Sequence, residues 1–372
     1  MVINKQAMRK SNEISVIKHV INYGPISRSQ ISKDLSINKV TISSILDDLL
    51  AKKYVKEIGE GESTIAGGRR PLLVSFNSDY GYFINLEMGS KTLKIMATLA
   101  NGYINRFEEI ALSAKSSNIK SLLQKKITDF SVPNTQKGLL GISLTVHKKE
   151  QLLSDSLVSW LKENYSIPVI VANNADAAAI FQRDFSSNNE IKDLITIVID
   201  ETINAGIIIN ENLYTGFGNN AGDLSEMQFL FSSNETMASF NPDTYCSQEA
   251  VLKNISKNEG LNNISIQEIA KLYFKGNKQV NKSISQFVKG LALVLNNLIA
   301  IFSPQMIILD STLLENIPNL LIQVKNNLPI LRKHHTQLQI ARKSRFAPLL
   351  GGYSLLLREV FDLGNKRLRL IP

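Results

Sequence analysis

Cysteine is almost absent from this sequence, which has 372 residues, one Cys and four His. A single cysteine excludes a disulfide framework, and the Cys and His residues do not stand at the spacing of zinc ligands. With 44% hydrophobic and 20% charged residues, the composition is that of an ordinary globular protein of two or three domains. Stability has to come from apolar cores in a reducing compartment, so we expect a cytoplasmic protein.

Long hydrophobic runs and an N-terminal signal stretch are also missing. Residues 1–11 are polar, and the longest apolar blocks are interrupted by Asn, Asp or Lys. A membrane-spanning helix needs roughly 20 mainly apolar residues. These absences argue against a membrane role.

Positive charge is in excess and is concentrated at the front of the chain. The formal net charge is +9, and residues 1–76 contain 12 Lys and Arg against 7 Asp and Glu. A compact basic segment favours a polyanionic partner, although a solvated basic surface is an equal alternative on charge alone. The pattern of residues has to decide between them.

Three helices and two strands are predicted in this basic segment. Apolar residues recur at helical spacing up to Tyr23 and stop at Gly24-Pro25, and Ser27 stands three residues before Gln30 as a helix cap does. Asn38 can cap a third helix, whose apolar positions are Val40, Ile42, Ile45, Leu46, Leu49 and Leu50. Strand-like runs follow at 55–58 and 72–76. The order predicts a winged helix-turn-helix, a DNA-binding fold.

The residues expected to contact DNA follow from this fold. The third helix would enter the major groove and meet base edges, whereas the start of the second helix would hold a phosphate through its backbone N–H groups and dipole. Arg69 and Arg70, beside two glycines, would enter the minor groove. The predicted contacts are Ser27, Arg28, Ser29, Asn38, Lys39, Thr41, Ser43, Ser44, Arg69 and Arg70.

Beyond Phe76, apolar strand runs alternate with helical patterns, which is typical of an α/β domain. Strands are predicted at 82–86, 92–99, 139–146, 169–171, 194–199 and 306–309, and helices at about 284–302 and 349–361. We therefore expect a DNA-binding domain at 1–76 and an α/β domain at 77–372.

The whole chain resembles the ROK family (repressor, open reading frame, kinase). The resemblance rests on Ile26-Ser27-Arg28, on Gly67 to Pro71, on Ile167-Pro168-Val169 leading into Asn173 to Ala178, and on Ala221 to Glu226. It implies a winged helix-turn-helix followed by a two-lobed, actin-like sugar-kinase domain, with lobes at about 77–185 plus the C-terminal helix and at 186–345. It also implies a sugar-responsive bacterial repressor.

The kinase motifs of the family are degraded here. Only one glycine survives in the first phosphate turn, Glu87-Met88-Gly89-Ser90-Lys91, and Asp200 and Glu201 bring negative charge to the second phosphate loop. Family kinases place an Asp base where this chain has Asn174, and an amide cannot take a proton at neutral pH. The sequence therefore predicts no enzyme and no cofactor.

The family's sugar contacts and zinc ligands give different expectations. The resemblance assigns effector binding to Asn173, Asn174, Asp223, Glu226 and Asp243. As an alternative, the acids are only surface or capping residues. The zinc-binding His of the family corresponds to Glu226 and its cysteines are missing around 240–243, so no metal is expected and Cys246 is predicted to be a small buried residue.

The sequence as a whole predicts a DNA-binding transcriptional regulator of carbohydrate genes, a repressor rather than an activator. Its partners would be double-stranded operator DNA, a sugar or sugar phosphate, and further copies of itself in a homodimer or tetramer. Closure of the lobes on the sugar would shift the two DNA-binding heads, so that ligand and DNA compete. The alternatives are a sugar kinase with an added DNA-binding domain and a regulator without a small-molecule effector.

Overall fold

The structure is a computed structural model that describes residues 5–61, 70–112, 119–147, 151–186, 190–233, 236–259, 264–341 and 344–371. It divides into two units, each described by itself below. The first contains Met1–Ala177, Arg183–Ser187 and Leu349–Pro372, and the second contains Ala178–Gln182 and Asn188–Pro348. The first unit therefore combines the predicted DNA-binding segment with the front of the α/β domain.

The front of the first unit is a winged helix-turn-helix, called the head below. Its elements are α1 (Lys5–Tyr23), β1 (Ile26–Ser27), α2 (Arg28–Leu35), α3 (Lys39–Ala51), β2 (Val55–Glu60) and β3 (Leu72–Phe76). The strands form an antiparallel sheet in the order β1-β3-β2, with β2 and β3 as the wing. The predicted fold is confirmed. Helix α1 starts at Lys5, six residues before Ser11, where the predicted apolar pattern begins, because its first turns are mainly polar and exposed.

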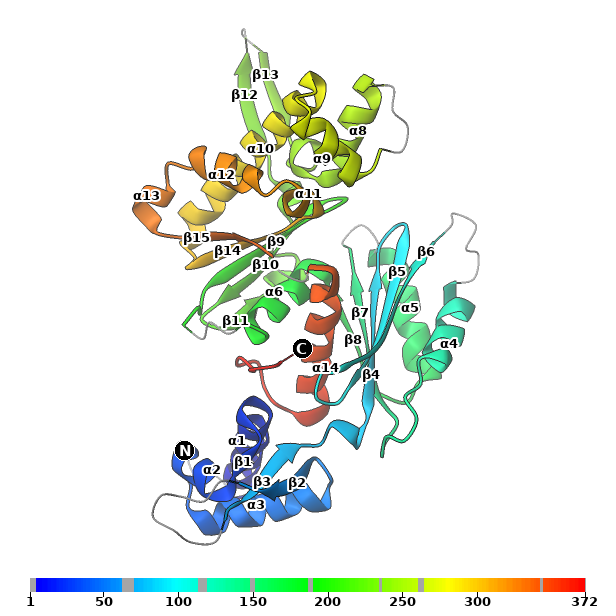
Figure 1. The fold of residues 1–372 in the computed structure, drawn as a ribbon, viewed down its shortest axis with the longest axis vertical. Helices are drawn as coiled ribbons and strands as arrows, with labels where there is room; N and C mark the ends of the chain where they lie inside the picture. The colour runs from blue at the N-terminus through cyan, green and yellow to red at the C-terminus, as the bar shows by residue number, and fades with distance from the viewer. Residues whose placement is uncertain are drawn as a thin grey trace. The chain divides into compact units, whose positions relative to one another are not determined.

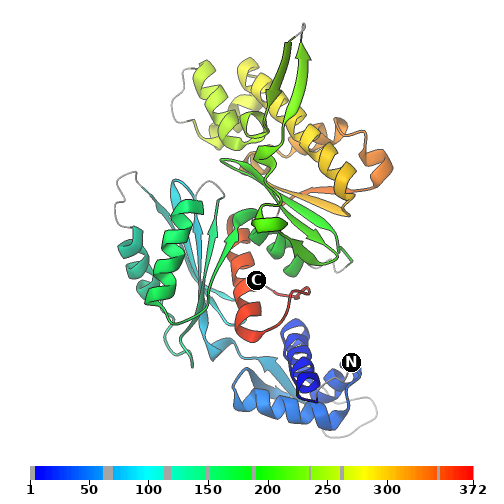
Figure 2. The ribbon, with the colours of Figure 1, turned by 180° about the vertical axis from the view of Figure 1, so that it is seen from behind.

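A five-stranded sheet in the order β6-β5-β4-β7-β8 organises the rest of the first unit. Its elements are η1 (Ser78–Tyr80), β4 (Tyr82–Met88), β5 (Thr92–Leu99), β6 (Ile104–Ala111), α4 (Ile119–Asp129), β7 (Leu139–Val146), α5 (Gln151–Asn164), β8 (Val169–Asn173), α6 (Asn174–Asp184) and α14 (Ala347–Phe361). Strands β4, β7 and β8 are parallel. Helices α4 and α5 cover one face of this sheet and α14 the other (Figure 1), as the reverse view in Figure 2 also shows.

Side chains of β4 alternate between the two faces of the sheet. Tyr82, Ile84 and Leu86 pack into the core under α4 and α5, whereas Phe83 packs against Tyr353 of α14. Helix α14 approaches closely because it carries two glycines: a Cβ on Gly351 would lie 1.8 Å from the carbonyl oxygen of Ala177, and one on Gly352 would lie 2.5 Å from Oγ of Ser143. A larger residue at position 351 would displace the helix, and one at position 352 would require the Ser143 side chain to shift.

The head shares its core with α14 rather than hanging on a free linker. Phe361, the last residue of α14, makes edge-on ring contacts with Tyr54 at 5.1 Å and with Phe76 at 5.2 Å. Tyr80, in the short turn between the head and the sheet, packs on the same ring. One apolar cluster therefore runs from α1 and α3 into α14 and the residues that follow it.

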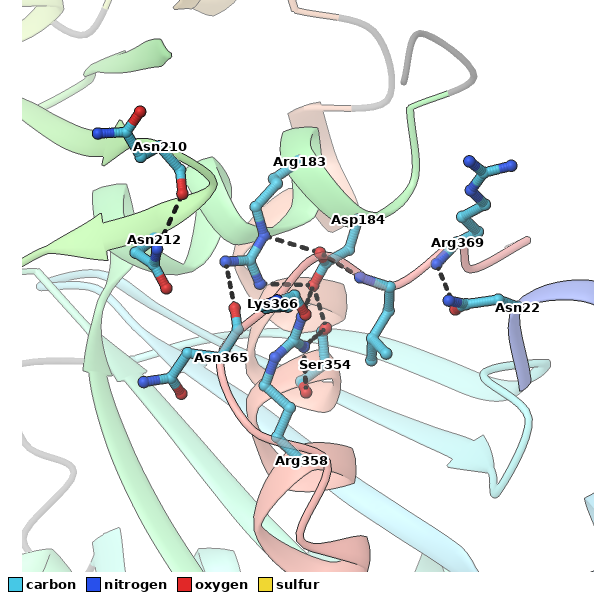
Figure 3. A network of polar contacts seen from close by, with 11 residues as sticks. Asn22, Arg183, Asp184, Asn210, Asn212, Ser354, Arg358, Asn365, Lys366 and Arg369 are labelled. Atoms are coloured by element: carbon cyan, nitrogen blue, oxygen red, sulfur yellow. Dashed lines mark hydrogen bonds and ion pairs between the residues drawn. The ribbon is translucent and has the colours of Figure 1, made fainter. Parts of the chain in front are cut away.

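A buried ionic network holds the residues after α14 (Figure 3). Asp184, fully buried at the end of α6, pairs with Arg183 at 2.8 Å and with Arg358 at 2.7 Å, and it accepts a hydrogen bond from Ser354. It also accepts from the backbone N–H of Leu368. Burial alone would raise the pKa of Asp184, but the two guanidinium groups hold it below the ordinary value. We call residues 365–371 the tail.

The second unit is built on a sheet in the order β11-β10-β9-β14-β15. The strands of this unit are β9 (Leu194–Ile199), β10 (Ile203–Ile209), β11 (Asn212–Tyr214), β12 (Phe229–Ser233), β13 (Thr236–Phe240), β14 (Met306–Asp310) and β15 (Gln337–Ile340). Strands β12 and β13 form a separate antiparallel pair. Its helices are α7 (Asp243–Cys246), α8 (Gln248–Glu259), α9 (Ile266–Phe274), α10 (Lys278–Phe302), α11 (Thr312–Asn316), α12 (Asn319–Asn326) and α13 (Leu331–His334), with short turns η3 (Phe217–Asn219), η4 (Leu224–Glu226) and η5 (Ser344–Phe346). Together with the first unit this gives the predicted α/β class.

Helix α10 forms the core of the second unit. Phe287, Leu291 and Leu295 lie on its buried side, in the same apolar cluster as Ile195 and Ile197 of β9. Within the described ranges, α10 is the one helix that is long and apolar enough to cross a membrane by length and composition. Its apolar face is used here to pack against the sheet.

Candidate nucleic-acid interface and effector site

The start of α2 has the predicted cap. Oγ of Ser27 accepts a hydrogen bond from the backbone N–H of Gln30 at 3.2 Å and lies 3.1 Å from Oγ of Ser29. The first N–H groups of a helix lack partners within the helix and favour an anion. Ser29 is exposed beside them. The arrangement suits a DNA phosphate at this point.

The third helix is also capped as predicted, and its first turn is open to solvent. Oδ1 of Asn38 accepts from the backbone N–H of Thr41 at 2.8 Å. Lys39 and Ser44 are exposed, whereas Thr41 and Ser43 are half-buried. Polar side chains that can reach base edges therefore cluster at the N-terminal end of α3, where helix-turn-helix proteins read DNA.

One residue of α3 was placed on the wrong side. The sequence pattern assigned Val40 to the apolar face, but its side chain is 81% exposed. The core face is formed by Ile42, Ile45, Leu46 and Leu49. Val40 stands two residues before Ile42, and two residues along a helix correspond to roughly 200°, which turns Val40 outward.

Arg28 is held in ion pairs inside the head. Its guanidinium group lies 2.7 Å from Asp47 of α3 and 3.6 Å from Glu57 of β2. A second arginine, Arg9 of α1, contacts Asp48 at 2.6 Å and Ser44 at 3.3 Å. The sequence did not single out Arg9, because its partners are more than 30 positions away. The two arginines connect α3 to helices α1 and α2.

The wing is closed by a hydrogen bond of 2.8 Å from the backbone N–H of Gly61 to the carbonyl oxygen of Pro71. Arg70 stands exposed beside this closure. Arg69 lies outside the described residues.

A second polar cluster lies in the first unit, where three parallel strands end. Glu87 is the last but one residue of β4, His147 directly follows β7, and Asn173 ends β8. Because carboxyl ends of parallel strands share one edge of a sheet, ligands of α/β proteins bind there. Oδ1 of Asn173 accepts from the backbone N–H of Ala175 and so caps α6. This side chain serves the helix start.

Asn174 has one amide atom without a hydrogen-bond partner among the described residues. Its Nδ2 lies 3.2 Å from Nδ1 and 3.4 Å from Nε2 of His147. Its Oδ1 is buried and, among the described residues, has no hydrogen-bond partner. A buried polar atom is normally satisfied, so an unpaired one calls for an explanation such as a bound water, an ion or a ligand. The sequence analysis considered the histidines only as possible metal ligands, which their spacing excluded, and so missed this contact of His147.

The Glu87 carboxylate is already neutralised. Nζ of Lys94 donates to both of its oxygens at 3.1 and 3.2 Å, and both side chains are mostly buried. Lys94 was not singled out by the sequence analysis, although it lies directly across the β4–β5 pair from Glu87. In this ion pair the charges of Glu87 and Lys94 are directed at each other.

The acids predicted to bind effector in the second unit serve local structure. Oδ1 of Asp223 accepts from the backbone N–H and Oγ of Ser225, at 3.2 and 2.6 Å. Oδ1 of Asp243 accepts from the backbone N–H of Ile203 at 2.9 Å. Glu226 is exposed. The Asp223 contact agrees with the capping alternative, whereas Asp243 binds the first residue of β10 and caps no helix.

The loop before Asp223 is fixed by a glycine. Gly222 has φ +80°, and a Cβ there would lie 1.8 Å from the carbonyl oxygen of Ala205.

The expected second phosphate loop is a tight turn between β9 and β10, in which the N–H of Asp200 donates to the carbonyl oxygen of Thr202. The carbonyl oxygen of Asp200 accepts from Gln248 at the start of α8.

Cys246 is fully buried, as predicted, and burial raises the pKa of its thiol to about 12. Within the described ranges, no group of three or more His, Cys, Asp or Glu side chains could hold a metal ion.

Known proteins are similar to this chain over most of its length. It is 32% identical to the xylose repressor of Staphylococcus xylosus, over 95% of this chain and 96% of the repressor. The fold is similar to a crystal structure of a ROK family transcriptional regulator, a homologue of the Escherichia coli MLC protein, with a TM-score of 0.75, 18% identity and coverage of 95% and 97%. A ROK glucokinase from Streptomyces griseus matches with a TM-score of 0.59 and 17% identity, over 74% of this chain and 99% of the enzyme.

The family sequence profile gives the assignment independently of the fold. The ROK family profile matches residues 84–359, which is most of the chain and lies behind the head. The chain belongs to the ROK family.

Proposed function

We propose that this protein is a DNA-binding transcriptional repressor of carbohydrate genes. The observation that carries the proposal is the extent of the similarity: the match to the xylose repressor covers 95% of the chain, whereas the match to the glucokinase covers 74%. A match over 95% of the chain has to include most of the head. The exposed, capped start of α3 supplies the surface that such a function needs.

The DNA contacts proposed are the residues at the two capped helix starts and the wing. Ser27 and Ser29 at α2 would hold a phosphate, and Asn38, Lys39, Thr41, Ser43 and Ser44 of α3 would meet base edges. Arg70, with Arg69, would follow the minor groove. Arg28 acts by fixing α3 through Asp47. The functional protein is a homodimer or tetramer in the cytoplasm on a palindromic operator.

The α/β domain at 77–372 has no kinase activity in this proposal. Phosphoryl transfer to a hydroxyl needs a base, and the amide of Asn174 beside His147 cannot act as one. The Glu87–Lys94 pair and the acidic turn at Asp200 further oppose a nucleotide. Neither a cofactor nor a metal is part of the mechanism.

The effector proposed is a sugar. Xylose is the first candidate, because the relative from Staphylococcus xylosus is named a xylose repressor. Asn174 is the contact best supported, since its Oδ1 is buried and can accept from a sugar hydroxyl. A sugar that binds the form with low DNA affinity more tightly would release the operator by linkage.

Two assays on the purified full-length protein test this function. Xylose, other pentoses, hexoses and their phosphates are screened by thermal shift, because a ligand of the folded state raises its Tm. Operator binding to the protein's own promoter region is then measured with and without each hit. A rise in Tm together with release of DNA supports the proposal. Transfer of phosphate from ATP to a hit would establish a kinase instead, and DNA binding that no sugar alters would favour a regulator without a small-molecule effector.

A further inference from the structure

Val40 is the large apolar side chain that α3 presents to solvent. It is 81% exposed and stands between exposed Lys39 and half-buried Thr41, one turn before exposed Ser44. The helix does not need it, since valine is a poorer helix former than alanine. The core does not need it either, because α3 packs through Ile42, Ile45, Leu46 and Leu49.

Val40 is not an isolated exposed side chain, because it lies beside a hollow in the surface of the head. A hollow of about 670 Å³ lies between the N-terminal parts of α1 and α3, and Met8, Ile37, Val40, Thr41 and Ser44 contribute to its lining. The lining also includes the polar residues Gln6, Arg9, Asn12, Ser36 and Asn38, so the hollow beside Val40 combines apolar and polar groups. This combination suits a partner whose surface is mainly polar with a small apolar group.

Charge favours the same end of the helix. Asp47 and Asp48 lie in the second half of α3, where Arg28 and Arg9 are occupied in neutralising them. The first half, from Lys39 to Ser44, contains no acid and one exposed lysine. A duplex with its negative phosphates can therefore approach Val40 more easily than the far end of the helix.

The major groove of DNA offers one apolar group, the C5 methyl of thymine, among its hydrogen-bond donors and acceptors. Resting on the proposed function, we propose that Val40 reads sequence directly and selects a T·A pair in the operator by packing against the thymine methyl. The hydroxyl groups of Thr41 and Ser44 and the ammonium group of Lys39 lie beside it for the polar edges of neighbouring bases.

The test removes the methyl from the DNA and its partner from the protein. Binding sequences are selected from a random duplex pool with the full-length protein, and each thymine of the selected site is then replaced by uracil, one position at a time. Burial of one methyl contributes about 0.8 kcal/mol, so uracil at the position read by Val40 should raise Kd about fourfold. In Val40→Ala, thymine and uracil at that position should give equal Kd values.

A matched control and a folding check accompany the variant. Ile322 of α12 is also an exposed aliphatic residue, at 59%, and Ile322→Ala should keep the full uracil penalty. The Tm of Val40→Ala should equal or exceed that of the wild type, because no buried contact is lost. If no uracil changes Kd, or if Val40→Ala keeps the penalty, Val40 does not read a thymine. If the selection enriches no sequence at all, the proposed DNA-binding function fails with it.

Discussion

The backbone N–H of Arg369 donates a hydrogen bond of 2.8 Å to Oδ1 of Asn22, joining the tail to helix α1 across 347 positions of sequence. The Arg369 guanidinium group lies 4.7 Å from the ring centre of Tyr23, the next residue of α1. The tail itself is held by Asp184, which also pairs with Arg358 of α14. The DNA-binding head is therefore fastened to the far end of the chain (Figure 3).

Removing the acid from this network should be severely destabilising. Asp184→Ala leaves Arg183 and Arg358 buried without their counter-charge, and loss of one partner of a buried pair costs about 3–5 kcal/mol. The measurement is the free energy of unfolding in urea. Lys10→Ala, which breaks the exposed pair with Asp362, is the control and should leave the unfolding curve unchanged. Similar curves for both variants would show that Asp184 does not stabilise the fold.

Lys18 of α1 should give the stability a distinctive dependence on pH. Burial, together with the charge of nearby Arg358, lowers its pKa from 10.5 to about 8. Between these values the unfolded chain binds a proton that the folded chain does not, so the folded state gains stability as pH rises from about 8 to 10.5. Below pH 8 the buried charge is a cost.

The variant Lys18→Met removes that cost. It should be more stable than the wild type at pH 7, and the difference should shrink as pH rises through 8 towards 10.5. Urea unfolding of both proteins at pH 7, 8, 9 and 10 measures this difference, which cancels the titration of other groups. A difference independent of pH would contradict a lowered Lys18 pKa.

The wing should contribute to DNA affinity mainly through charge. Arg70→Ala should weaken operator binding and reduce the slope of log Kd against log salt concentration by about one, and adding Arg69→Ala should reduce it further. Fluorescence anisotropy at four salt concentrations gives the slope. Lys325→Ala in α12 removes the same charge from an exposed site in the second unit and should leave the slope as it is. An unchanged slope in the Arg70 variant would remove the wing from the interface.

Asn174 should matter for the sugar and not for DNA. Asn174→Ala removes the unpaired Oδ1, so the rise in Tm caused by xylose or another hit should fall or vanish, while operator binding without sugar stays within twofold of the wild type. Asn326→Ala, at an exposed position of α12, serves as the control and should retain the sugar response. A full sugar response in Asn174→Ala would place the effector elsewhere.

Much of the fold could be predicted from local patterns. The strand limits at Leu72–Phe76, Thr92–Leu99, Leu139–Val146 and Leu194–Ile199 agree with the structure, because short, mainly apolar runs mark buried strands. Both helix caps, Ser27 and Asn38, were visible because they act over three residues. Strand β6, with charged Arg106, Glu108 and Glu109 on an edge of the sheet, was missed since its pattern is half polar.

The site was less predictable, for reasons of distance. The contacts of Asn174 with His147 and of Lys94 with Glu87 depend on strand pairing that no local pattern records. The network around Asp184 joins residues from 183 to 368, and short-range spacing gives no sign of it. Val40 was misplaced for a local reason. It was grouped with the core residues of α3 because it is apolar, although its angular position on the helix turns it away from them.

The apolar cluster that the head shares with Tyr353, Leu368 and Leu370 has a consequence for biosynthesis. During translation, residues 16–76 leave the ribosome long before these partners do. Part of the core of the nascent head therefore stays exposed, and we expect the head to acquire affinity for the operator only after Leu370 has left the ribosome. A polysome carrying incomplete chains would then leave the promoter free.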